Sequence, residues 1–215
     1  MKHQQTKKLT VLAMLCAFAY VVMVFLRFPV VLFLKYEPKD VIITIGGFLY
    51  GPLAAFAVSG VVSFLEMLTV SDTGWIGMIM NILSTCSFAC TAAFFYKKRH
   101  DLTGALTGLV VGTVLMVAVM LGWNYILTPL YMGQSRSDIA AMLVPVFLPF
   151  NLIKGGLNGA FTALMYRPLV QGLRKAGLFP KSQSTNAPDT SRKILFYALA
   201  LVMLALSVGG ILLLS

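Results

Sequence analysis

Charged residues are scarce in this sequence. Only 11% of the 215 residues are Asp, Glu, Lys or Arg, whereas 59% are hydrophobic. Soluble domains contain about 25% charged and about 45–50% apolar residues. A soluble chain of this size could not hide so much apolar side-chain surface without exposing large patches of it. The composition therefore excludes an ordinary soluble domain and predicts a protein embedded in a lipid bilayer.

Motifs for catalysis and nucleotide binding are also missing. The sequence contains no Gly-x-x-x-x-Gly-Lys-Ser/Thr and no His-Glu-x-x-His, so it has neither an ATP-binding P-loop nor this zinc-protease motif. The two histidines, His3 and His100, lie next to basic residues at the ends of apolar segments. A Ser-His-Asp arrangement within the membrane is therefore unsupported. We expect a protein that is not an enzyme and carries no cofactor.

Cysteine is represented by three residues, Cys16, Cys86 and Cys90, all inside apolar segments. Their odd number and their positions argue against a disulfide framework. Cys86 and Cys90 have the i,i+4 spacing of one helix face, but no His or acidic residue close by in the sequence completes a metal site. We predict that all three are small packing residues and that the chain has no metal site.

Long apolar runs are abundant. A spanning helix needs roughly 20 residues, and runs near this length lie at 8–28, 52–70, 75–96, 102–128, 141–169 and 194–214. A shorter run, 40–50, ends at the helix-breaking Gly51-Pro52. The expected fold class is all-α: a polytopic membrane helical bundle. We predict a six-helix core at 1–170, a polar cytoplasmic linker at 171–193 and an accessory transmembrane helix at 194–215.

The net charge of +10 is distributed unevenly along the chain. If the N-terminus is cytoplasmic and the helices alternate in direction, most basic residues lie inside; the exceptions are Arg27, Lys35, Lys39, Arg136 and Lys154. This asymmetry follows the positive-inside rule, provided that 40–50 counts as a crossing. We therefore read the basic residues as topology signals and expect contact with lipid, not with nucleic acid.

Three polar places lie in the outer half of this predicted topology. Ionisable groups at the bilayer centre cost about 2.5–3.5 kcal/mol on insertion scales, so they indicate function by default. Asn151 and Lys154 share one helix face, and Asn124 lies between two aromatic residues. The third place is the loop of 29–39 that leads into the short run, with Lys35, Tyr36 and Asp40.

Each place has a plainer alternative. Lys154 could be paired with a buried acid, either Glu66 or Asp40, and the loop could simply be solvated. Glu66 and Asn81 are weaker candidates, because one interhelical hydrogen bond would account for either. Taken together, amides, one cation and aromatic or Met side chains suit a flat, largely apolar ligand with a polar edge, bound from outside.

Several of these segments resemble the substrate-binding S component of energy-coupling factor (ECF) vitamin transporters, and most closely the riboflavin-specific members. The resemblance covers about residues 8–170. It rests on the six-helix plan, Ala13-x-x-x-Ala17, the loop Phe33-Leu34-Lys35-Tyr36-Glu37 with Asp40, the junction Gly46-Gly47-Phe48-Leu49-Tyr50-Gly51-Pro52, Trp123-Asn124-Tyr125 and Phe150-Asn151-Leu152-Ile153-Lys154-Gly155. The run at 194–214 departs from the six-helix plan of that family.

The resemblance implies both a ligand and partners. It implies that Asn124, Asn151 and Lys154 contact the ring system of riboflavin, and that the first loop covers it. It also implies docking through Ala13 and Ala17 onto a membrane scaffold subunit that carries two cytoplasmic ATPase subunits. Spacing alone favours ordinary packing within the chain for the two alanines, since pairs of small residues four apart are common in membrane helices.

Two other functions remain open at this point. The cargo could be another vitamin or a precursor, since cargo depends on loop and pocket residues. Alternatively, Lys154 and Glu66 could form a proton relay in a stand-alone secondary transporter.

Overall fold

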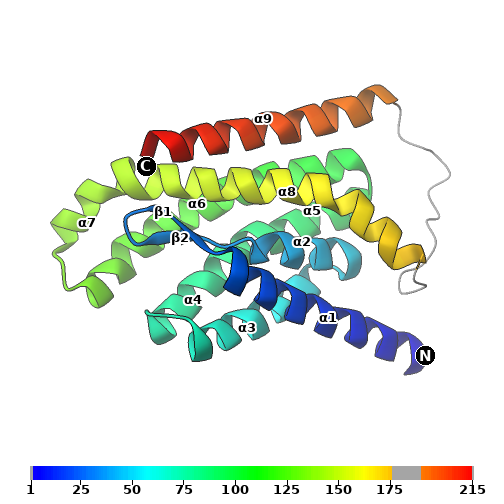
Figure 1. The fold of residues 1–215 in the computed structure, drawn as a ribbon, viewed down its shortest axis with the longest axis horizontal. Coiled ribbons are helices and arrows are strands. Elements are labelled where there is room, and N and C mark those ends of the chain that lie inside the picture. The colour runs from blue at the N-terminus through cyan, green and yellow to red at the C-terminus, as the bar shows by residue number, and fades with distance from the viewer. Residues whose placement is uncertain (1, 176–189, 215) are drawn as a thin grey trace.

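The computed structural model describes residues 2–175 and 190–214, which form a bundle of helices and one short hairpin (Figure 1). The elements are α1 (Lys2–Leu26), β1 (Phe28–Val31), β2 (Leu34–Tyr36), α2 (Lys39–Tyr50), α3 (Pro52–Thr69), α4 (Gly74–Thr85), η1 (Cys86–Cys90), α5 (Thr91–Arg99), α6 (Leu102–Met132), α7 (Arg136–Met142), η2 (Leu143–Phe147), α8 (Leu148–Lys175) and α9 (Thr190–Leu214). The all-α membrane bundle is confirmed, with the hairpin as a small addition.

Six helical stretches are long and apolar enough to cross a membrane: Gln5–Leu26, Pro52–Thr69, Gly74–Arg99, Leu102–Leu130, Arg136–Tyr166 and Ile194–Leu213. The third and fifth each contain one π-helical turn, η1 and η2, so each is one continuous helix interrupted by a wider turn. These stretches correspond to the six long apolar runs of the sequence. The protein is therefore a multi-pass membrane protein.

Helix α2 is the short crossing. Its 12 residues rise about 18 Å, whereas the apolar core of a bilayer is about 30 Å thick. Its first residues lie below the end of the bundle that carries Arg27, and its last residue, Tyr50, lies near the opposite end, where the Lys8 ammonium is 5.8 Å from the centre of the Tyr50 ring. Residues Lys39–Phe48 are all buried, so α2 is enclosed by other helices.

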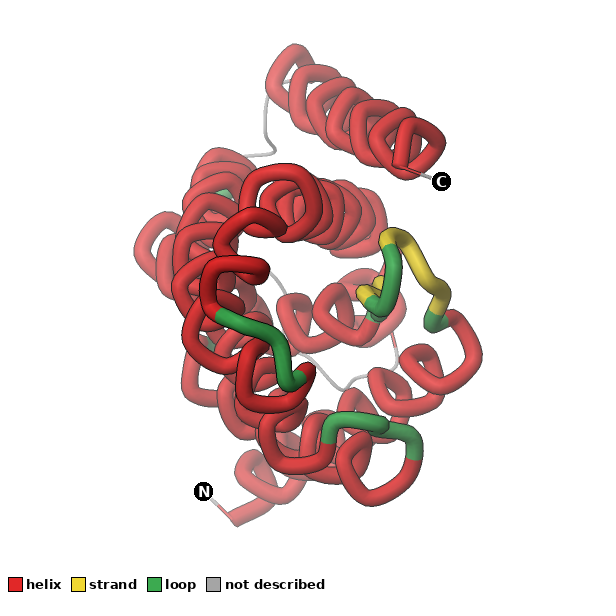
Figure 2. Tube along the Cα trace, turned by 90° about the vertical axis from the view of Figure 1, so that its left-hand side faces the viewer, coloured by secondary structure: helices red, strands yellow, loops and turns green. Residues whose placement is uncertain are grey.

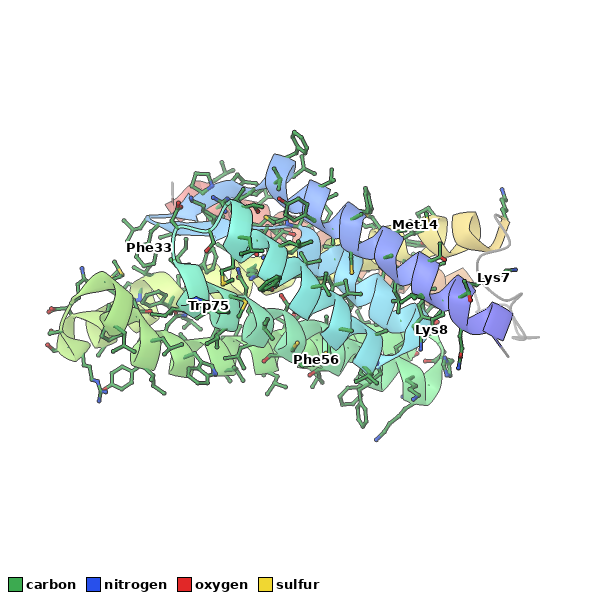
Figure 3. The ribbon with its side chains drawn as sticks, turned by 90° about the horizontal axis from the view of Figure 1, so that it is seen from below. Lys7, Lys8, Met14, Phe33, Phe56 and Trp75 are labelled. Atoms are coloured by element: carbon green, nitrogen blue, oxygen red, sulfur yellow. The ribbon has the colours of Figure 1, made fainter. Side chains whose placement is uncertain are left out.

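The two ends of the bundle differ in charge. Lys7 and Lys8 lie at one end, and Phe33 and Trp75 lie at the other (Figure 3). The N-terminus is at the basic end and the C-terminal end of α9 is at the opposite one (Figure 1). An odd number of crossings, with α2 included, explains this arrangement.

The structure places several element boundaries differently from the sequence pattern, mostly near helix ends. The predicted polar loop at 129–138 is helical up to Met132, and α7 starts at Arg136. The first loop contains an antiparallel hairpin in which Phe28 pairs with Tyr36. Within the predicted linker at 171–193, residues up to Lys175 continue α8 and residues from Thr190 belong to α9. Its central part, 176–189, lies outside the described residues.

Helix α1 packs on the bundle through one face. Val11, Leu15 and Ala19 recur every four residues and are buried, as expected for one stripe of a helix. Ala13 and Ala17 lie on the exposed side of the same helix. Their small side chains are therefore not used for packing within the described part of this chain, which removes the alternative that spacing alone favoured.

A stripe of glycines brings α6 against the helix of η1 and α5. A Cβ atom added at Gly108 would lie 2.6 Å from the Ala92 carbonyl oxygen, and one at Gly112 would lie 2.7 Å from that of Phe88. Small residues at such spacing let membrane helices approach closely. The two backbones touch here, and only glycine fits.

We expect Gly112→Ala to destabilise the protein by about 1–3 kcal/mol, because the added methyl group would meet backbone that cannot move aside. The matched control is Gly122→Ala in the same helix, where an added Cβ has no heavy atom within 4 Å. Thermal unfolding of both variants in detergent measures the difference. Equal unfolding midpoints for the two variants would contradict a close backbone contact between α6 and η1.

Candidate functional site

A hollow lies at the end of the bundle opposite the N-terminus, between the hairpin and four helices. It is lined by Arg27, Phe33, Leu34, Lys35, Glu37, Glu66, Ser71, Asp72, Thr73, Gly77, Met80, Asn81, Ser84, Met120, Asn124, Phe150, Asn151 and Lys154. The short α2 leaves this space, because its N-terminal end stops below the ends of its neighbours. The hollow is therefore sunk into the bundle and covered on one side by the turn of the hairpin.

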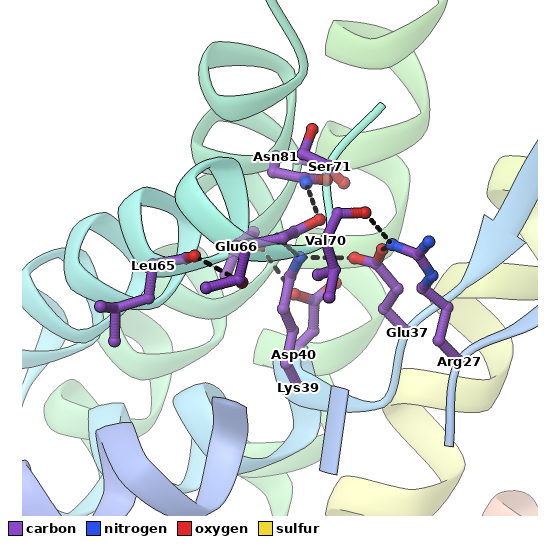
Figure 4. Close-up of polar contacts among 12 residues, drawn as sticks. Arg27, Glu37, Lys39, Asp40, Leu65, Glu66, Val70, Ser71 and Asn81 are labelled. Carbon is purple, nitrogen blue, oxygen red and sulfur yellow. Dashed lines mark hydrogen bonds and ion pairs between the residues drawn. The ribbon is translucent and has the colours of Figure 1, made fainter. Parts of the chain in front are cut away.

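A buried charge cluster closes one wall of the hollow (Figure 4). The Lys39 ammonium, fully buried at the start of α2, donates to the carboxylates of Glu37 and Glu66. The Asn81 amide donates to the other oxygen of Glu66 at 2.8 Å. Arg27 lies 4.0 Å from Glu37 and donates to the Val70 carbonyl oxygen at 3.3 Å. The cluster joins the hairpin, α2, α3 and α4.

The carboxyl of Glu37 lies in the connection between the hairpin and α2, outside the spanning helices. Burial by itself would raise the pKa of this carboxyl. The nearby ammonium groups of Lys39 and Lys154 outweigh burial, so its pKa lies below the usual value. Glu37 is therefore charged at neutral pH and can hold Lys39.

Asp40 forms the floor behind the hollow and is completely buried. One carboxylate oxygen accepts a hydrogen bond from the Thr85 hydroxyl at 2.7 Å. The other accepts from the Asn158 amide at 3.0 Å and lies 3.4 Å from the Lys154 ammonium. Since buried charges need both a counter-ion and hydrogen bonds, Asp40 has the partners that it requires.

Lys154 and Asn158 connect this floor to the hollow and to the hairpin. The Lys154 ammonium donates to the Ser84 hydroxyl at 3.1 Å and also lines the hollow. The Tyr36 hydroxyl of β2 donates to the Asn158 carbonyl oxygen at 3.0 Å. A ligand in the hollow would therefore meet a cation whose position is fixed from behind by Asp40.

The two asparagines offer amide groups to the hollow. The Asn151 amide donates to the Phe147 carbonyl oxygen one turn earlier, at 2.7 Å. Asn124 accepts from the Thr128 hydroxyl at 3.3 Å. An amide has two N–H donors and one carbonyl acceptor, and these bonds use only part of that capacity. Both side chains are buried, so their orientation is fixed by the surrounding helices.

Positive and negative charges balance around the hollow. The lining contains three basic residues, Arg27, Lys35 and Lys154, and three acidic ones, Glu37, Glu66 and Asp72. Lys39 and Asp40 behind the wall add one charge of each sign. The remaining surface comes from apolar side chains such as Phe33, Met80, Met120 and Phe150. This composition suits an uncharged ligand with apolar and hydrogen-bonding parts.

The predicted site residues divide into two groups. Asn124, Asn151, Lys154 and Lys35 line the hollow. Tyr36 and Asp40 are buried behind it and hold Asn158 and Lys154, so the structure gives them a supporting position instead of a place in the lining. The expected pairing of Lys154 with a buried acid also exists, with Asp40 as the partner. The pair and the hollow lie side by side.

The structure also shows the partners of Asn81 and Glu66, the two weaker candidates, and so bears on the proton relay. Asn81 and Glu66 are hydrogen-bonded to each other, as the plainer alternative expected, and both line the hollow. Glu66 pairs with Lys39 and not with Lys154. A direct Lys154–Glu66 relay therefore has no support in the described structure.

Sequence reasoning missed Lys39, Thr85, Ser84 and Asn158. Asn158 could have been found, since Asn151, Lys154 and Asn158 share one helix face at i, i+3 and i+7. Lys39 belongs to the loop that the sequence predicts either as solvated or as a cover over the site, and nothing local indicates that its ammonium group is buried. Thr85 and Ser84 resemble ordinary helix residues in the sequence and gain their role only from neighbours on α2 and α8.

Comparison with known proteins tests the family resemblance that the sequence indicates. The model of the family described as "ECF transporter, substrate-specific component" matches residues 7–166, about three quarters of the chain. This chain belongs to that family. As an S component, it shares its fold with a solved S component of a bacterial ECF transporter. The two are 32% identical with a TM-score of 0.67, covering 79% of this chain and 99% of the other.

Relatives of this S component carry names that state a cargo. The riboflavin transporter RibU of Staphylococcus aureus is 31% identical over 182 residues, covering 80% of this chain and 95% of its own. The riboflavin transporter FmnP of Bacillus subtilis is 30% identical over 187 residues, covering 80% and 98%. The family match ends at residue 166, so helix α9 lies beyond it.

We expect Asp40→Ala to lower the free energy of unfolding of this S component by about 3–5 kcal/mol, because Lys154 would remain buried without its counter-ion. The control is Asp72→Ala, whose partner Lys35 is 3.4 Å away at the surface and whose loss should cost about 0–1 kcal/mol. Thermal unfolding in detergent reports both. Adding Lys154→Met to Asp40→Ala should recover part of the loss; no recovery would contradict a direct pair.

Proposed function

We propose that this chain is the riboflavin-binding S component of an ECF importer. It captures the vitamin outside the cell and releases it inward when coupled to a scaffold subunit and two ATPase subunits. The observation that carries the proposal is the charge-balanced hollow that Asn124, Asn151 and Lys154 line under the hairpin. The names of the two relatives support the choice of cargo.

The chemistry of riboflavin fits the lining residues. The pyrimidine edge of its ring system has carbonyl acceptors and one N–H donor. Asn124 and Asn151 can satisfy both kinds of group, whereas Lys154 can only donate. The dimethylbenzene end of the ring requires apolar walls, and Phe33, Met120 and Phe150 provide them. Riboflavin is also uncharged, as the balanced lining requires.

The orientation in the membrane follows from the basic end of the bundle. Lys7, Lys8, Lys97, Lys98 and Arg99 belong to this end, and the positive-inside rule places such residues in the cytoplasm. The N-terminus is then cytoplasmic and the hollow opens to the outside of a bacterial cell membrane. This direction is the one that capture of an external vitamin needs.

The scaffold docks on α1 in this proposal. Ala13 and Ala17 are exposed on that helix, and small residues at this spacing allow another helix to approach closely. The sequence contains no P-loop, which fits a proposal in which ATPase subunits bound to the scaffold supply the energy for release.

We expect Asn151→Ala to weaken riboflavin binding about tenfold or more, because a buried polar group of the ligand loses its partner. Leu152→Ala is the matched control, since Leu152 is the next residue of α8 and is half exposed on its outer face. Quenching of flavin fluorescence by the purified protein measures both affinities. Equal affinities would contradict a ligand bound against Asn151.

The identity of the cargo is tested separately on the unmodified protein. We expect riboflavin to co-purify with it and to bind more tightly than other vitamins in a direct panel. Tight binding of a different flat vitamin, with no affinity for riboflavin, would keep the S-component function and overturn the cargo.

We expect the pair Ala13→Leu and Ala17→Leu to abolish co-purification with the scaffold subunit while riboflavin affinity stays unchanged, because the larger side chains separate the two helices. Ala198→Leu is the control, an exposed alanine on α9. Affinity purification of the complex with its ATPase subunits reads out docking. Retention of the scaffold by the α1 variant would place the docking surface elsewhere.

A further inference from the structure

Helix α9 lies wholly beyond the family match, which ends at residue 166. It lies outside the ring formed by the other helices, against α8 (Figure 2). Figures 1 and 2 place it on the side of the bundle away from α1. The docking surface proposed on α1 is therefore unobstructed, and the function of α9 has to be sought in what it contacts.

Small residues bring α9 close to α8. A Cβ added at Gly156 of α8 would lie 2.2 Å from the Ser207 hydroxyl oxygen of α9, and one at Gly210 of α9 would lie 3.0 Å from Ile153 of α8. The Ser207 hydroxyl is bonded within its own helix, to the Met203 carbonyl oxygen at 2.8 Å. The two helices are thus packed closely at the level of Lys154, the residue of α8 that lines the hollow.

The same stretch of α9 also reaches the hairpin. Val30, Val31 and Tyr36 of the hairpin form a buried apolar cluster with residues of α8, and Leu204 and Ile211 of α9 pack against that cluster. The hairpin covers the hollow and is tied to α8 by the bond from Tyr36 to Asn158. Helix α9 therefore supports the outer side of the hairpin and of α8 together.

The opposite face of α9 requires no further partner. Its large exposed side chains are aliphatic, as lipid contact demands; they include Leu201, Val202, Leu206, Leu212 and Leu213. Lipid chains are as apolar as these side chains and could also cover the apolar cluster of the hairpin. A helix differs from lipid in that its side chains are fixed, so it restricts the motion of what it covers.

We infer that α9 is a clamp that holds the β1–β2 hairpin against the outer half of α8 and thereby slows the escape of ligand from the hollow. The effect on ligand escape rests on the proposed riboflavin binding, whereas the clamping of the hairpin does not. The residues that position the hairpin are Ser207 and Gly210, through α8, and Leu204 and Ile211, through the apolar cluster.

The test compares two adjacent glycines of α9. Gly210→Leu would push α9 away from Ile153, whereas Gly209→Leu would not, since an added Cβ at Gly209 has no heavy atom within 4 Å. Hydrogen exchange of the amides of 28–36 is measured by mass spectrometry on the full chain without ligand. The dissociation rate of riboflavin is then measured on the same samples by fluorescence.

We expect faster hairpin exchange and about 5- to 10-fold faster riboflavin release in Gly210→Leu than in Gly209→Leu, because changes at a binding site act mainly on the dissociation rate. Equal hairpin exchange in the two variants would overturn the clamp, whatever the ligand is. If the unmodified protein does not bind riboflavin, the cargo proposal fails, and the exchange measurement still decides the clamp.

A crosslink tests the same contact by strengthening it, whereas Gly210→Leu weakens it. The Cβ positions of Gly156 and Ser207 are 3.6 Å apart, within the usual range of about 3.5–4.5 Å for a disulfide. We expect Gly156→Cys with Ser207→Cys to crosslink on mild oxidation, with Cys16, Cys86 and Cys90 changed to Ser. Hairpin exchange should then be slower in the oxidised than in the reduced sample. Absence of a crosslink, or exchange that oxidation leaves unchanged or faster, would overturn the inference.

Discussion

The carboxylate of Asp40 is held by three side chains from two other helices: Thr85 at the end of α4, and Lys154 and Asn158 on α8. A buried carboxylate needs such partners, since an unpaired charge in an apolar interior is strongly destabilising. The need fixes the start of α2 relative to α4 and α8. Asp40 from behind and the Ser84 hydroxyl together hold the Lys154 ammonium group at the hollow.

The length of α2 makes this arrangement possible. A helix that filled the apolar layer would place its first residues at the membrane surface, where Asp40 and Lys39 would be solvated. With about 18 Å of rise, α2 starts well inside the bundle. The hairpin bends in to reach it and becomes one wall of the hollow. The hollow and the buried charge cluster therefore have the same structural origin.

Charges of opposite sign are balanced around the hollow. Each cation near the lining has a carboxylate partner: Arg27 has Glu37, Lys39 has Glu37 and Glu66, Lys154 has Asp40, and Lys35 has Asp72. Little uncompensated charge remains to attract an anion or a cation. The lining then offers mainly amide groups and apolar side chains, which is the chemistry that the proposed uncharged ligand requires.

The sequence by itself determined the membrane class, the six long spanning helices and the candidates Asn124, Asn151 and Lys154, because apolar length and buried polar residues are local signals. It also fixed α9 as a spanning helix, but not what that helix packs against. Only the tertiary structure decided that Lys39 is buried, that Asp40 pairs with Lys154, and that Tyr36 supports the wall of the site. These facts depend on contacts between residues as many as 122 positions apart, as for Tyr36 and Asn158. No local pattern carries that information, since the burial of a charge is set by the helices that surround it.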